Sequence, residues 1–155
     1  TFCYCSYKIT TMKIHLATDH AGFEYKEALK AHLFEHSYEV IDHGNTKLDE
    51  NDDYPDYVTD LAKAISKDVE SKGIVFGGSG EGEAMCANRI VGARAVVYYG
   101  GDKDILTFSR LHNNANILSI GARFMTTDEM IEAVDFWLGV EFSHEERHIR
   151  RLEKF

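Results

Sequence analysis

The stretch that decides the fold is Gly73-Ile74-Val75-Phe76-Gly77-Gly78-Ser79-Gly80-Glu81-Gly82-Glu83-Ala84-Met85-Cys86-Ala87-Asn88. A short apolar run, typical of a buried strand, leads into a glycine-rich loop and then into a segment that favours a helix. Glycines permit positive φ and let backbone N–H groups approach a ligand, and a helix start adds partial positive charge. The stretch therefore predicts a strand, loop and helix whose loop can bind an anion or oxyanion. The same pattern also occurs as a structural turn, so both interpretations stay open.

The spacing of this loop excludes two kinds of nucleotide site. A Walker-type phosphate loop requires Lys after its last glycine, but Glu83 follows Gly82 and its carboxylate would repel a triphosphate. The dinucleotide fingerprint that Gly78 and Gly80 begin requires glycine or alanine at position 83, where the chain again has Glu83. The loop thus favours a different anionic ligand.

On both sides of the loop, strand-like apolar runs alternate with helix-length segments. This alternation is typical of an α/β fold with a parallel sheet covered on both faces, and right-handed crossovers then bring the loops after the strands to one edge. The predicted strands are residues 13–17, 38–41, 73–76, 93–98 and 117–120, and the predicted helices are residues 24–35, 57–67, 82–89, 103–112 and 128–138.

At 155 residues, the chain has the length of one domain. We expect residues 12–155 to form this single domain and residues 1–11 to be an N-terminal extension, either disordered or not native. Residues 143–155 predict a short polar helix with a basic face formed by Arg147, Arg150, Arg151 and Lys154. The composition, with 44% hydrophobic and 28% charged residues, is that of an ordinary globular protein.

The net charge of −9 argues against a nucleic acid or an anionic membrane as partner, because the field of the molecule would repel both. An anionic ligand must then be held by a local cluster of cations. Three cysteines and the absence of a secretory or membrane-spanning apolar run favour a reducing, cytoplasmic setting.

No metal site is predicted. Asp49-Glu50-Asn51-Asp52-Asp53 resembles the start of a calcium loop, but Tyr54 stands where glycine is needed and Asp60 where glutamate is needed. Cys3 and Cys5 lack further ligands for zinc, and Cys86 is expected to pack as a small hydrophobic residue.

Several polar residues near predicted strand or helix ends have both a structural and a functional interpretation. Glu83 suits a helix N-terminus electrostatically but could also act as a base beside N–H donors. Asp19 could cap a helix, while His20 could donate to a phosphate or sugar hydroxyl. His112 could favour a helix C-terminus or move a proton. Arg147 and Arg151, four residues apart, could form a solvated face or bind phosphate together with Arg123.

In combination, six motifs resemble the type B ribose-5-phosphate isomerase family over residues 12–152. They are Thr18-Asp19-His20-Ala21-Gly22, Asp53-Tyr54-Pro55, Gly77 to Glu83 with Ala87-Asn88, His112-Asn113, Gly121-Ala122-Arg123, and Arg147-His148-Ile149-Arg150-Arg151. The resemblance implies a Rossmann-like three-layer α/β/α sandwich with five parallel strands. It also implies a homodimer that can pair into tetramers, a site shared between subunits, and no metal or organic cofactor.

The activity implied is the interconversion of D-ribose 5-phosphate and D-ribulose 5-phosphate through an enediolate, a step of the pentose phosphate pathway. By resemblance, Glu83 is the base, His112 assists opening of the sugar ring, and Ser79 helps to stabilise the enediolate. The substrate-binding residues implied are Asp19, His20, Gly78, Gly80, Glu81, Gly82, Asn113, Arg123, Arg147 and Arg151.

One departure from the family's pattern indicates which branch of the family this chain resembles. Many members of the family use a cysteine base at the position that Gly77 holds here, and this chain resembles a second branch with Gly-Gly-Ser-Gly followed by a glutamate base. Two alternatives stay open: an isomerase of a six-carbon sugar phosphate, such as galactose 6-phosphate or allose 6-phosphate, and a module that binds a sugar phosphate without turnover.

Overall fold

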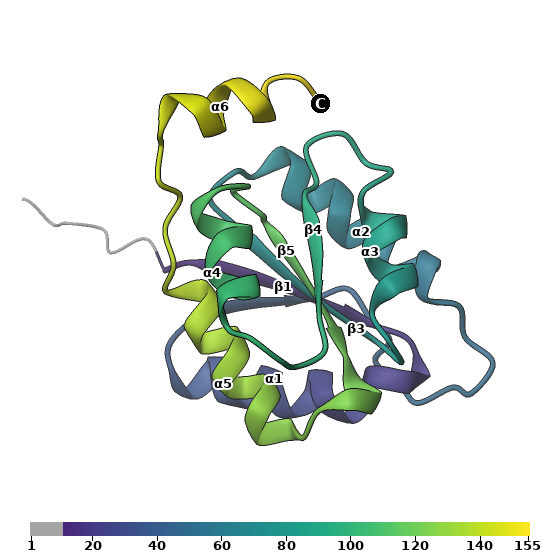
Figure 1. Cartoon of the computed structure of the whole chain (residues 1–155). Coiled ribbons are helices and arrows are strands. Elements are labelled where there is room, and N and C mark those ends of the chain that lie inside the picture. The colour runs from purple at the N-terminus through teal and green to yellow at the C-terminus, as the bar shows by residue number, and fades with distance from the viewer. Residues whose placement is uncertain (1–10) are drawn as a thin grey trace, which may run out of the picture.

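The computed structural model describes residues 11–155, which form a five-stranded parallel sheet between two layers of helices (Figure 1). The strand order is β2-β1-β3-β5-β4, and all neighbouring pairs are parallel. The strands are β1 (Lys13–Thr18), β2 (Glu39–Asp42), β3 (Lys72–Gly77), β4 (Ala95–Tyr98) and β5 (Ile117–Gly121). The predicted three-layer α/β/α architecture is confirmed.

The helices divide between the two faces of the sheet according to the alternation of side chains along the strands. Even-numbered residues such as Ile14 and Phe76 pack on α1, α4 and α5, while odd-numbered residues such as Ala17 and Val75 pack on α2 and α3. The helices are α1 (Phe23–Glu35), α2 (Tyr54–Lys67), α3 (Glu81–Ala87), α4 (Asp104–Leu111), α5 (Thr127–Leu138) and α6 (Glu146–Leu152), with short 3₁₀ turns η1 (His20–Gly22) and η2 (Ala122–Phe124).

The observed element ends differ from the predicted ones by a few residues. Helix α2 begins at Tyr54 instead of residue 57, because Pro55 suits the first turn of a helix. The C-terminal basic helix is also shorter than residues 143–155 and covers Glu146–Leu152. Of the expected extension, only Thr11 falls within the described residues, and residues 1–10 lie outside them.

Strands β1 and β3 are neighbours at the point where the strand order reverses, so the chain leaves their carboxyl ends toward opposite faces of the sheet. In open α/β sheets such a point forms a crevice for ligands. The Asp19–Gly22 segment follows β1 and the glycine loop follows β3, so both meet at this point.

Within residues 11–155, no helix combines the length and apolar character needed to cross a membrane.

Candidate active site

The glycine loop is held against the neighbouring strand end by close backbone packing. Gly80 adopts a φ of +80°, a left-handed conformation that glycine accepts without strain, and its carbonyl accepts a hydrogen bond of 2.6 Å from Ser119 Oγ. A Cβ on Gly121 would lie 2.6 Å from the Ser79 carbonyl oxygen, so β5 and the loop approach as closely as two backbones allow. The loop is therefore a fixed structure before any ligand binds.

Glu83 points its carboxylate back toward the start of this loop. The residue lies in the first turn of α3 and is only 4% exposed. A Cβ built on Gly77 would overlap the Glu83 carboxylate, so the carboxylate occupies the space that a side chain at position 77 would need. The glycine at position 77 and the position of the Glu83 carboxylate are thus physically linked.

Burial raises the pKa of the Glu83 carboxyl above its ordinary range, because the charged form loses hydration. The negative charge of Asp19 raises this pKa further, whereas a hydrogen bond from the residue's own N–H opposes the increase. A carboxyl with raised proton affinity beside amide donors can accept a proton from carbon more readily than an exposed carboxylate.

Ser79 and Glu81 stand at the open side of the loop. The Ser79 hydroxyl oxygen accepts from the Glu81 N–H at 3.3 Å, so its own hydrogen remains available to a ligand oxygen. Glu81 is exposed. Gly82 lies under Tyr54, whose hydroxyl would be 2.7 Å from a Cβ at that position. Tyr54, at the start of α2, thereby closes one wall of the loop.

Arg123 extends over the loop from η2, directly after β5. Its N–H donates to the Gly78 carbonyl at 3.1 Å, and its guanidinium carbon lies 3.0 Å from the position that a Cβ on Gly78 would take. The side chain is exposed. A cation therefore lies beside the loop amides, in a position to bind an anionic group.

Asp19 and His20 follow β1 at the same edge of the sheet. Asp19 caps η1 by accepting from the Ala21 N–H at 2.9 Å, which confirms its structural interpretation. The His20 ring donates from Nδ1 to Asp52 Oδ1 at 2.9 Å, and this hydrogen bond raises the pKa of His20. Arg123 is close enough that its charge opposes this increase in pKa, so two basic groups converge here.

Donor atoms of Asp19, His20 and Asp52 lie within 4.8 Å of one another, which is a spacing that a metal ion could use. The three residues also take part in hydrogen bonds: Asp19 Oδ1 accepts from the Ala21 N–H, and Asp52 accepts from His20 and from Asn45. These bonds give the cluster a structural role at the end of β1.

The remaining predicted site residues form a second group on α4 and α6. His112 caps α4; its ring stacks on Phe108 at a centroid distance of 4.8 Å and lies tilted against His148 at 4.4 Å. Burial lowers the pKa of His148, and the proximity of His112 and Arg147 adds to this effect. Asn113 is exposed beside His112.

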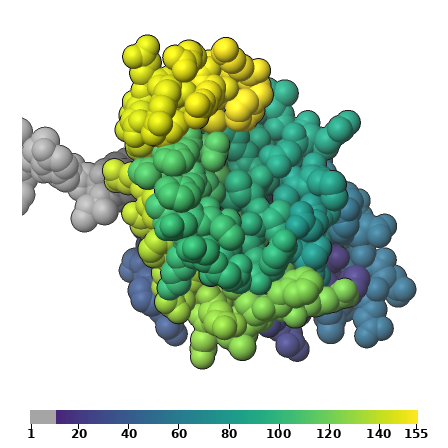
Figure 2. Space-filling view, in the orientation of Figure 1, coloured from purple at the N-terminus to yellow at the C-terminus, as the bar shows by residue number. Residues whose placement is uncertain are grey.

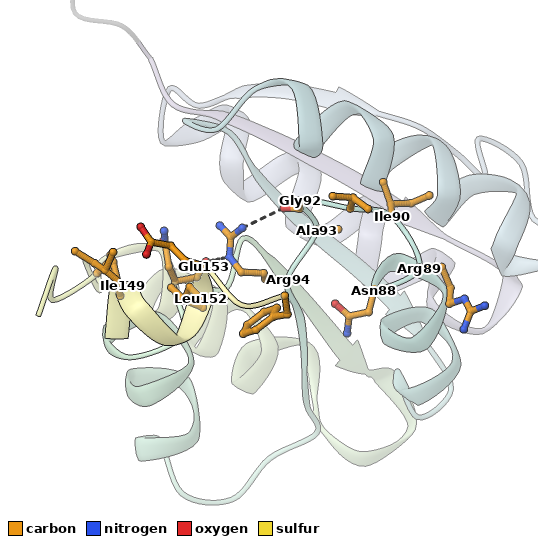
Figure 3. A pocket seen from close by; sticks show the side chains of 13 residues that line it. Asn88, Arg89, Ile90, Gly92, Ala93, Arg94, Ile149, Leu152 and Glu153 are labelled. Carbon is orange, nitrogen blue, oxygen red and sulfur yellow. Dashed lines mark hydrogen bonds between the residues drawn. The ribbon is translucent and has the colours of Figure 1, made fainter. Parts of the chain in front are cut away.

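Helix α6 lies on the surface of the molecule at one end of the sheet (Figures 1 and 2). Arg147 and Arg151 are exposed on it, and Arg147 pairs with Glu145 at 2.8 Å. The helix covers a hollow of about 440 Å³ that Ile149 and Leu152 line together with Arg94 and its neighbours before β4 (Figure 3). The residues that line this hollow include none of the glycine loop.

The two groups lie at opposite ends of the strands. Gly77 pairs with Gly121 at the carboxyl edge, whereas His112 and Asn113 precede Ile117, where β5 begins. The four-residue step from Ile117 to Gly121 alone spans about 13 Å at roughly 3.3 Å per residue. One chain therefore brings Asp19, His20, the glycine loop, Glu83 and Arg123 together, and it does not bring His112, Asn113, Arg147 and Arg151 to them.

Sequence reasoning did not identify Asp52, Asn45 or Tyr54 as parts of the site's wall. The pattern around Asp52 resembles a calcium loop, and nothing in it connects Asp52 with His20, which is 32 positions away. The available signals are the acidic character of the segment 49–53 and, for Tyr54, its place in the Asp53-Tyr54-Pro55 motif.

The fold and site define a doubly wound α/β protein with a buried carboxylate and basic groups at the switch point of its sheet. Comparison with known proteins gives the family. Residues 14–155 match the Ribose/Galactose Isomerase family, so the chain belongs to that family, as the six motifs indicated.

Individual relatives carry a more specific name. The chain is 39% identical to ribose-5-phosphate isomerase B of Mycolicibacterium paratuberculosis over 142 residues, which cover 92% of this chain and 88% of that protein. It is 38% identical to ribose-5-phosphate isomerase B of Escherichia coli, with 91% of this chain and 92% of that protein covered.

Solved structures agree. The structure of ribose-5-phosphate isomerase B from Mycoplasma genitalium with bound ribulose-5-phosphate matches with a TM-score of 0.86 and 35% identity, and the match covers 92% of this chain and 93% of that one. The enzyme from Thermotoga maritima matches with a TM-score of 0.85 and 38% identity, covering 92% and 96%.

Proposed function

We propose that this protein is an aldose-ketose isomerase that interconverts D-ribose 5-phosphate and D-ribulose 5-phosphate. The observation that carries the proposal is the Glu83 carboxylate, which is buried against Gly77 at the mouth of an amide-lined loop. The free thiol of Cys86 fits the reducing, cytoplasmic setting that we propose for the reaction.

In the proposed mechanism, ionised Glu83 removes the proton from C2 of the open-chain aldose. The negative charge that develops on the sugar oxygen is stabilised by the N–H groups of the glycine loop and by the Ser79 hydroxyl, whose hydrogen is free. A proton then passes from O2 to O1, Glu83 returns the carbon-bound proton to C1, and the carbonyl forms at C2, which yields the ketose. Because burial raises the proton affinity of Glu83, this carboxylate accepts the proton from C2 more readily than an exposed carboxylate would, and its pKa lies closer to the pH at which the reaction runs.

We further propose that a homodimer completes the site. Glu83 and Arg123 lie at one end of the sheet while His112, Arg147 and Arg151 lie at the other, so the second group can serve only the loop of a second copy. His112 would then promote ring opening, and the arginines of the second copy would join Arg123 around the phosphate.

The direct test is turnover of ribose 5-phosphate by the purified protein, with ribulose 5-phosphate as the measured product. We expect turnover that an added chelator leaves unchanged, because the steps above use protein groups alone. Allose 6-phosphate and galactose 6-phosphate provide the comparison for sugar length. If the folded dimer leaves ribose 5-phosphate unreacted, or converts a six-carbon sugar phosphate faster, the proposed substrate is wrong.

A further inference from the structure

Asp52 is a nearly buried carboxylate that the proposed mechanism does not use. Only 4% of its side chain is exposed, although it belongs to the long connection between β2 and α2. Its Oδ1 accepts from the backbone N–H of His20 and from His20 Nδ1, both at 2.9 Å, and its Oδ2 accepts from Asn45 Nδ2 at 2.7 Å. Three hydrogen bonds thus converge on one side chain.

The connection itself is fixed to the end of β1, so Asp52 is held in place from both sides. Thr18 N–H donates to the Gly44 carbonyl at 2.8 Å, and Asn45 N–H donates to the Thr18 carbonyl at 2.9 Å. Asn45 is only 6% exposed. The position of the Asp52 carboxylate therefore depends on the sheet and not on a freely moving loop.

This arrangement decides which nitrogen of His20 faces a ligand. A carboxylate can only accept, so Nδ1 must carry a hydrogen. Among residues 11–155, no hydrogen-bond partner is found for His20 Nε2, and 37% of the side chain is exposed. The ring is thereby held with Nε2 as the nitrogen available for binding.

We propose that Asp52 is a positioning residue, which fixes the His20 imidazole so that Nε2 donates a hydrogen bond to the anionic phosphoryl group of the substrate. This inference rests on the proposed function for the identity of the ligand. The geometry itself follows from the hydrogen bonds of Asp52.

The charges that face His20 support the proposal. Its hydrogen bond with Asp52 raises the pKa of His20 most, and the charge of Asp19 raises it further, while burial and the charge of Arg123 oppose the increase. Burial alone would raise the pKa of Asp52, but the hydrogen bonds from His20 and Asn45 outweigh it and lower that pKa. When the ring is protonated, Nε2 also carries a hydrogen, and His20 and Arg123 then offer two donors to one phosphoryl group.

The test uses Asp52→Asn and Asp52→Ser in the full-length protein. NMR titration of His20 in the free protein reports its pKa without any need for turnover, and inorganic phosphate serves as the binding probe. We expect the His20 pKa to fall in both variants and the phosphate dissociation constant to rise about tenfold or more, since a charge-assisted donor is lost. The KM for ribose 5-phosphate should rise similarly, while kcat changes less than about threefold.

Two comparisons separate positioning from general damage to the fold. Asp56→Asn removes the same charge from an exposed position in the first turn of α2 and should leave the His20 pKa and KM unchanged. In a His20→Ala background, Asp52→Asn should weaken phosphate binding no further.

The inference is wrong if the His20 pKa is the same in Asp52→Asn as in the unmodified protein. It is also wrong if Asp52→Asn weakens phosphate binding as much in the His20→Ala background as it does when His20 is present. The absence of a phosphate-dependent signal at His20 in the unmodified protein would do the same. If ribose 5-phosphate were not turned over but the His20 pKa and phosphate binding depended on Asp52, the proposed function would fail and the role of Asp52 would stand.

Discussion

The link between Gly77 and Glu83 gives a prediction that can be worked through in detail. Gly77 lies outside the left-handed region of φ, so its backbone accepts an alanine, but the added Cβ would overlap the Glu83 carboxylate. Gly77→Ala therefore forces the carboxylate to move. Overpacking of this kind typically costs about 1 to 3 kcal/mol of unfolding free energy. Displacement of a catalytic group by about 1 Å can cost roughly 100-fold in turnover.

A double-mutant cycle tests this prediction. We expect Gly77→Ala to lower kcat by about 100-fold and Glu83→Ala to relieve the overlap, so that the stability cost of Gly77→Ala shrinks by at least about 1 kcal/mol in the double variant. Urea unfolding measures the stabilities. Gly139→Ala is the matched control, because Gly139 has a φ of −80° and a Cβ there would meet its nearest neighbour only at 3.5 Å. If the two stability effects add within about 0.5 kcal/mol, the overlap argument is wrong.

Three further predictions follow from burial and from the divided site. Arg147→Ala and Arg151→Ala should each raise the KM for ribose 5-phosphate by roughly tenfold or more, because each removes a charge-assisted bond. When Arg147→Ala copies are mixed with Glu83→Gln copies, some mixed dimers should contain one intact site, and a complete lack of recovered turnover would contradict a shared site. The pKa of Glu83 is raised in the folded state, so ionisation of Glu83 lowers the stability of the folded protein as the pH rises. Between pH 4 and 7, the unfolding free energy of Glu83→Gln should therefore increase relative to that of the unmodified protein, and a difference that does not change with pH would contradict this. Burial, together with the charge of His43, lowers the pKa of His15 from 6.5 to about 4. The unfolding free energy should therefore fall by about 2 kcal/mol between pH 7.5 and 5, because the unfolded state takes up a proton at His15 and the folded state does not. An equally steep fall in His15→Leu would refute this origin.

Much of the fold was predictable because its signals are local. Alternating apolar runs and helix-length segments specified five strands and their intervening helices, and Pro55 shows why one boundary was missed: the residue favours a first helical turn, which the apolar period does not reveal. The glycine loop was found for the same reason, since its strand, turn and helix are consecutive in the chain.

The parts of the site that were not predicted depend on contacts between distant segments. Asp52 meets His20 only because the connection before α2 folds back on the end of β1, and such long-range closure leaves no periodic signal. Sequence resemblance identified Gly77 as a departure from the cysteine branch. Only the structure explains the departure, because the Glu83 carboxylate fills the space beside Gly77.

Glu83 is the group that we propose takes the proton from the sugar, and the rate at which Glu83→Gln releases the C2 hydrogen of ribose 5-phosphate to solvent tests this role. Glutamine keeps the size of the side chain but cannot act as the base. We expect unchanged substrate affinity and a release rate at least about 100-fold lower than in the unmodified protein. A rate close to that of the unmodified protein would show that another group removes the proton.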